Sequence, residues 1–142
     1  MGLFNSFAIS GSGMSAEKLR LDIVSNNLAN IHTAGRSADD TYKRQVPIFA
    51  EQLKQTMGQD KLNFNGGGVK VTGITKDPAP PRLVYEPSHP YANQEGYVAY
   101  PNINVLNEMT DMITATRAYE ANVTAFNAAK GMALKALEIG RG

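Results

Sequence analysis

The sequence has no cysteine and no tryptophan, and only two of its 142 residues are histidines. The lack of cysteine excludes disulfide bonds and thiolate metal ligands within the chain. The histidines, His32 and His89, lie at no helical metal-ligand spacing from another strong ligand. We therefore interpret both as solvated loop residues, and we expect no metal site, no cofactor and no catalytic centre.

An excess of charge is also missing. The chain carries 14 basic and 13 acidic residues, a formal net charge of +1, and no run of like charges. The sequence therefore contains no cluster of basic residues that would bind nucleic acid or acidic lipid. No segment approaches the roughly 20 apolar residues of a membrane span. The stretch Met1 to Ser15 lacks a basic start and is interrupted by polar residues, so it makes a poor secretory signal peptide.

Sequence patterns typical of enzymes are absent as well. The chain contains no G-x-S-x-G or H-E-x-x-H pattern. The three glycines at 66–68 are followed by Val69-Lys70-Val71, without the Lys-Ser/Thr pair of a phosphate-binding loop. We expect Asn65 to Gly68 to form a turn or flexible loop, and the chain is predicted not to be an enzyme.

Both ends of the chain have helical periodicity. Between Leu3 and Ile31, apolar residues recur at alternating spacings of three and four, although Gly11 and Gly13 each cost about 1 kcal/mol relative to alanine in a helix. A second pattern predicts one helix from about Ile103 to Glu138, roughly 54 Å long. The wide apolar faces of both helices favour contact with more than one neighbour.

The middle of the chain, 36–102, contains the prolines and most of the turn signals. Short alternating runs predict strands at Val69–Thr75, Arg82–Tyr85 and Gly96–Tyr100. Val46–Met57 could form one additional short helix, although Pro47 restricts its start to the first helical turn.

These patterns predict a mainly α fold with a small β-containing insert. The expected parts are an N-terminal axial helix (1–35), a loop and insert (36–102) and a long C-terminal axial helix (103–142). The terminal helices should pair as an antiparallel, coiled-coil-like hairpin with the insert at its far end.

Three stretches resemble the flagellar rod and hook family of axial proteins: Ser12–Asn30, Lys76–Val105 and Asn107–Arg141. The resemblance is closest to proximal rod members. One departure from the family pattern, Asn104 to Asn107, falls at the expected start of the long helix. The residues that match family motifs are Asn26, Asn27, Leu28, Ala29, Asn30, Arg117, Tyr119, Glu120, Ala121 and Asn122.

The resemblance implies a structural subunit of the periplasmic rod, which would join the membrane-embedded ring to the distal rod and transmit torque. It also implies export by the flagellar type III apparatus without a cleaved signal peptide. The implied partners are other rod proteins, the basal-body ring and adaptor proteins, the export apparatus and further copies of the chain. No nucleic acid partner is expected, and no membrane span.

The helical frames predict where subunits and helices would meet. The expected interface residues are Phe7, Met14, Leu21, Val24, Leu28, Ile31, Met109, Met112, Tyr119, Val123, Phe126 and Leu137. Arg117 and Glu120 are spaced to form an ion pair. The alternatives are another rod subunit, a coiled-coil adaptor or export chaperone, and a small hydrolase, for which no nucleophile and base pattern is present.

Overall fold

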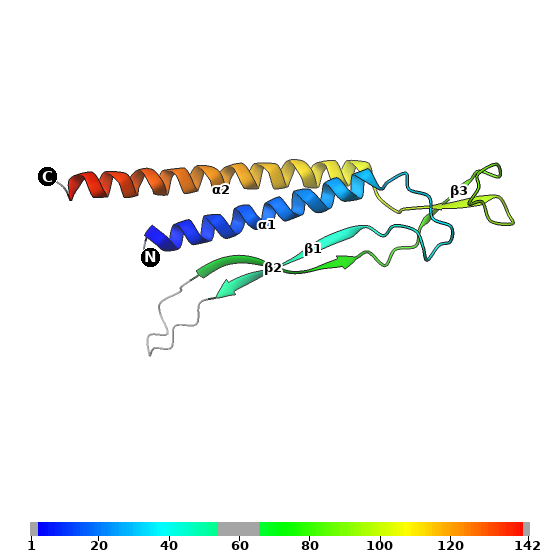
Figure 1. Ribbon diagram of the computed structural model, residues 1–142, viewed down its shortest axis with the longest axis horizontal. Helices are drawn as coiled ribbons and strands as arrows, with labels where there is room; N and C mark the ends of the chain where they lie inside the picture. Colours follow the sequence, from blue (N-terminus) through cyan, green and yellow to red (C-terminus); the bar gives the residue numbers. More distant parts are fainter. Residues whose placement is uncertain (1–2, 54–65, 141–142) are drawn as a thin grey trace.

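The computed structural model describes residues 3–53 and 66–140, which form two long helices and two β-hairpins. In chain order the elements are α1 (Leu3–Ala29), β1 (Gln45–Leu53), β2 (Gly66–Lys76), β3 (Arg82–Tyr85), β4 (Tyr97–Tyr100) and α2 (Val105–Ile139). Figure 1 shows α1 and α2 side by side along the long axis. The predicted mainly α fold with a small β insert is confirmed.

The helices α1 and α2 are antiparallel. At the open end, where α1 begins and α2 ends, the rings of Phe7 and Phe126 meet edge to face with centroids 4.9 Å apart. At the closed end, where α1 ends and α2 begins, Asn27 lies against Glu108. The helix α1 runs unbroken through its two glycines. A Cβ at Gly13 would lie 2.8 Å from Asn122 Oδ1, so this glycine allows the helices to approach closely.

The helix α2 begins next to its predicted start because Asn104 caps it. The Asn104 side chain accepts hydrogen bonds from the backbone N–H groups of Leu106 and Asn107, at 2.9 and 3.4 Å. The departure from the family pattern therefore contributes a cap to this helix. With 35 residues against 27, α2 is longer than α1 by roughly 12 Å, and Figure 1 shows it extending beyond α1 at the open end.

The face of α2 that packs on α1 differs from the predicted frame. Its buried residues are Glu108, Ala115 and Ala129, with Met112 and Phe126 half-buried between them. Only part of the predicted frame, including Met112, Tyr119 and Phe126, belongs to this contact. Between the larger side chains, the buried Ala115 and Ala129 leave room for the two helices to approach closely.

The β1–β2 hairpin runs along α1. Its register pairs Gln45 with Lys76 and shifts between Ile48 and Phe49 and again before Leu53. The prediction of a short helix over Val46–Met57 is wrong as far as Leu53, and residues 54–57 lie outside the described residues. The predicted turn is also wrong at Gly66–Gly68, which begin β2, while Asn65 is outside the described residues.

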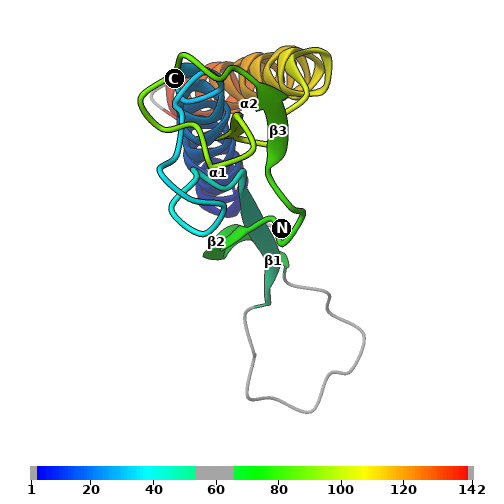
Figure 2. The same cartoon turned by 90° about the vertical axis from the view of Figure 1, so that its right-hand side faces the viewer.

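The β3–β4 hairpin lies beyond the closed end, and both strands fall where they were predicted. Val98 in β4 is fully buried, and Gly35 N donates to Ala99 O at 3.0 Å. The expectation that the whole insert sits at the far end is wrong for β1 and β2. Figures 1 and 2 show instead that α1 lies between α2 and the β1–β2 hairpin.

Candidate assembly surfaces and polar junction

Six charged or polar side chains from three segments meet at the closed end, and we call this group the polar junction: Arg20, Asn27, Tyr42, Arg44, Glu108 and Asp111. The Glu108 carboxylate is fully buried. Its Oε1 pairs with Arg44 Nε at 2.5 Å, and its Oε2 accepts from Asn27 Nδ2 at 3.0 Å. A buried carboxylate is tolerated only with such partners, so Glu108 fixes where the three segments meet.

Asn27 has its full hydrogen-bonding capacity satisfied although it is 1% exposed. Its Nδ2 donates to Gln45 O (2.9 Å) and to Glu108, while its Oδ1 accepts from Gln45 N (3.0 Å) and Tyr42 Oη (2.9 Å). An amide side chain offers two donors and two acceptor lone pairs, and all four are used here. Asn27 therefore joins the end of α1 to the start of β1 and to α2.

Asp111 extends the junction toward solvent. It receives Arg20 Nη2 at 3.0 Å and Arg44 Nη2 at 3.2 Å, so Arg44 bridges two acidic residues of α2. Among the six residues, only Asn27 was singled out from the sequence. Glu108 and Asp111 lie one helical turn apart near the start of α2, and this spacing of acidic residues was the available signal.

The environment of Tyr42 favours its neutral form. Burial, and then the negative charge of Glu108, raise the pKa of the Tyr42 phenol above its ordinary value. The phenol therefore stays a hydrogen-bond donor to Asn27 to a higher pH than an ordinary tyrosine would.

The predicted interface residues have different degrees of burial. In and after α1, Val24 is buried, whereas Phe7, Met14, Leu21, Leu28 and Ile31 are half-buried. In α2, Met112, Tyr119, Val123 and Phe126 are half-buried. Met109 and Leu137 are exposed, at 50% and 67%, and contribute little to the hairpin.

The motif residues also divide between interior and surface. Asn27 is buried, and Leu28, Asn30, Tyr119 and Asn122 are half-buried; the exposed members are Asn26, Ala29, Arg117, Glu120 and Ala121. Arg117 and Glu120 do not form the expected ion pair in the described part of the chain. Their exposed side chains are available to neighbouring molecules.

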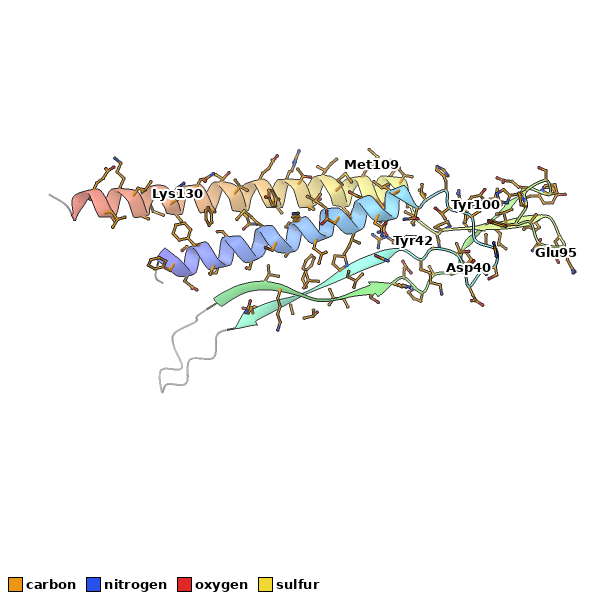
Figure 3. The ribbon with its side chains drawn as sticks, in the orientation of Figure 1. Asp40, Tyr42, Glu95, Tyr100, Met109 and Lys130 are labelled. Carbon is orange, nitrogen blue, oxygen red and sulfur yellow. The ribbon has the colours of Figure 1, made fainter. Side chains whose placement is uncertain are left out.

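Large apolar side chains are exposed at both ends of the helical hairpin. We call Val105, Leu106, Met109 and Ile113 the closed-end patch; the exposed large apolar residues at the open end are Phe4 of α1 and Met132, Leu134, Leu137 and Ile139, which lie on more than one side of α2. Figure 3 labels Met109 and Lys130 toward the two ends of α2. Groups of exposed apolar residues of this kind mark surfaces that bind other molecules.

The described residues contain no group of three or more His, Asp or Glu side chains able to hold a metal ion. Within the same residues, neither helix is both long enough and apolar enough to cross a membrane. The features that stand out are contact surfaces and the polar junction.

Comparison with known proteins identifies the family. A family model described as flagella basal body rod protein matches residues 7–35, and one described as flagellar basal body rod FlgEFG protein C-terminal matches residues 94–139. The flagellar basal-body rod protein FlgC of Borreliella burgdorferi is 41% identical over the full length of both chains. The FlgC proteins of Bacillus subtilis and Salmonella typhimurium are 44% and 38% identical, each covering 99% of this chain and 100% of the relative. The chain belongs to the FlgC family.

Membership of the FlgC family gives the chain its role. FlgC proteins are rod proteins of the flagellar basal body, so this chain is a structural subunit of the basal-body rod and not an enzyme. The resemblance drawn from the sequence is thereby confirmed, and the hydrolase and adaptor alternatives find no support. The two family matches contain α1 and α2 almost completely, whereas Tyr42 and Arg44 of the polar junction lie between them.

Proposed function

We propose that this FlgC-family chain assembles into the proximal rod through the outer faces of its terminal helices. The partners would be other rod proteins, the basal-body ring and adaptor proteins, and further copies of the chain. The observation that carries this proposal is the exposure of large apolar side chains at both ends of α2. Because water contact with these side chains is unfavourable, their burial by neighbouring subunits would drive assembly.

The three parts of the chain would have different roles in the assembled rod. Residues 1–35 and 103–142 would supply the axial helices, which pair along a coiled-coil-like seam, and residues 36–102 would brace them. The polar junction supports a role in torque transmission, because its buried ion pair and hydrogen bonds resist sliding of α1 against α2.

Export would use the flagellar type III apparatus, without cleavage of a signal peptide. This part of the proposal is supported by the two glycines of α1, which make that helix marginally stable when it is isolated. Such a segment would pass through the export apparatus in an extended state at little cost in lost helix stability.

A pair of neighbouring substitutions tests the assembly surface. Ile113 in the closed-end patch is 55% exposed, and the next residue, Thr114, is also exposed. In cells that make only the altered chain, Ile113→Asp should abolish swimming and rods while the chain is still exported. Thr114→Asp should leave rods intact. Normal rods containing the Ile113→Asp chain would contradict the proposal.

A further inference from the structure

The first residues of β2 lie against the N-terminal half of α1. Val69 N donates a hydrogen bond to Ser12 Oγ at 3.1 Å, and the same hydroxyl donates to Ile9 O at 2.7 Å. About two helical turns toward the start of α1, Asn5 Nδ2 donates to Gly66 O at 3.3 Å. Side chains of α1 thus bind backbone groups at two points of a strand that begins far away in sequence.

Glycine is required where β2 meets α1. Gly68 has φ +97°, in the left-handed region that side chains disfavour, and a Cβ there would overlap the Ser12 hydroxyl. The same Cβ would lie 3.4 Å from the Ile9 Cα, so strand and helix backbones are nearly in contact. Gly73, in the same strand, has open space where a Cβ would be.

Next to these hydrogen bonds, α1 and β2 are not closely packed. Between α1 and β2 a hollow remains, lined by Ala16, Leu19 and Val71 among others. The hairpin's large side chains Ile48 and Ile74 are about half exposed and do not fill it. Ser12 and Asn5 therefore contribute to the attachment, and Gly68 lets Ser12 reach the strand.

We propose that Gly66–Val69 form a latch that closes over α1 and holds its N-terminal half in the helical hairpin. Ser12 is the positioning residue of this latch. The first half of α1, through Ala16, carries no charged side chain and contains both helix glycines, so it is the part of the helix that most needs support. The covered face of α1 is then unavailable to neighbouring subunits in the rod.

This inference rests on the proposed function, because the latch is expected to be closed in the assembled rod. Two matched pairs of substitutions test it in cells that make only the altered chain. Gly68→Ala is compared with Gly73→Ala in the same strand, and Ser12→Ala with the exposed Ser15→Ala one turn along α1.

Labelling of an introduced cysteine reports on the latch itself, since the chain has no cysteine of its own. Leu19→Cys places a thiol in the hollow under β2, and the exposed neighbour Lys18→Cys serves as a control. In purified basal bodies, Gly68→Ala and Ser12→Ala should each speed maleimide labelling of the cysteine at position 19 by about fivefold or more. This is the change expected when the closed latch loses one hydrogen bond and therefore opens more often. Labelling at position 18 should not change.

The expected result is normal export of all four variants, with weaker swimming and faster labelling only for Gly68→Ala and Ser12→Ala; Ser12→Thr, which keeps the hydroxyl, should recover swimming. Equal labelling at position 19 within each matched pair would overturn the latch while leaving the proposed function intact. Absence of the unaltered chain from basal bodies would overturn both.

Discussion

At the scale of single residues, Asn27 and Glu108 determine how the segments of the chain are joined. Both are almost inaccessible to solvent, and each depends on partners from a different segment. Removing one partner from such a group is costly, because a buried polar atom is then left without a hydrogen bond.

Asn27→Asp should weaken the rod strongly. The substitution replaces a donor with a carboxylate beside Glu108, where Nδ2 now lies 3.0 Å from Oε2, so two negative charges would share one buried site. We expect a loss of about 2 kcal/mol or more in stability. Thermal dissociation of purified basal bodies measures it. Ser25→Asp, at an exposed position of the same helix, is the control, and similar behaviour of the two variants would contradict the role of Asn27.

Tyr42 gives the junction a dependence on alkaline pH. Its folded-state pKa is raised, so its contribution is fully present below the unfolded pKa of about 10 and is lost as pH rises through the folded value. Rods should therefore lose stability above about pH 10. Tyr42→Phe should be less stable at neutral pH, because the hydrogen bond to Asn27 is missing, and should show a smaller loss on alkalinisation. An unchanged alkaline profile in Tyr42→Phe rods would refute this.

At the scale of elements, the two helices and three of the four strands could be predicted because periodicity and turn residues are local signals. The β1 strand could not, since its pairing with β2 and the hydrogen bonds from Asn27 to Gln45 come from residues distant in sequence. On α2, the predicted frame and the buried positions overlap only in part. Met112, Tyr119 and Phe126 of that frame are half-buried and Met109 is exposed, while the fully buried apolar positions are Ala115 and Ala129.

Ala115, where α1 and α2 approach each other closely, offers a test of the contact between the two helices. Ala115 is 0% exposed, so Ala115→Leu inserts three carbon atoms where there is no space and should cost about 1 to 3 kcal/mol. Ala121 is exposed on the same helix, and Ala121→Leu should leave the hairpin intact. Swimming and rod yield at raised temperature compare the two. If Ala115→Leu rods were as stable as Ala121→Leu rods, the observed seam would not be the one used in the rod.

At the scale of the whole molecule, α1 is covered by α2 on one side and by the β1–β2 hairpin on the other, whereas α2 keeps large exposed apolar side chains at both of its ends. The polar junction could be predicted only in part. Its acidic residues, Glu108 and Asp111, form ion pairs only because the fold brings Arg20 and Arg44 beside them from two other segments.

Val123→Asp tests assembly of the whole subunit. Val123 is half-buried between Tyr119 and Phe126, so a neighbour that completes its burial would desolvate an aspartate at a cost of several kcal/mol, or force it to take up a proton. The penalty would recur in every copy and should block rod assembly without preventing synthesis. Thr124→Asp, at the exposed next position, should assemble. Normal rods with stoichiometric Val123→Asp chain would show that Val123 faces solvent.

The most direct measurement is an electron cryo-microscopy map of intact basal bodies that contain this chain. We expect density in the proximal rod for the antiparallel pair of α1 and α2, with the β1–β2 hairpin along α1 and with the exposed apolar side chains at both ends of α2 covered by neighbouring subunits. A map in which these side chains face solvent, or in which the chain lies outside the rod, would contradict assembly through the terminal helices.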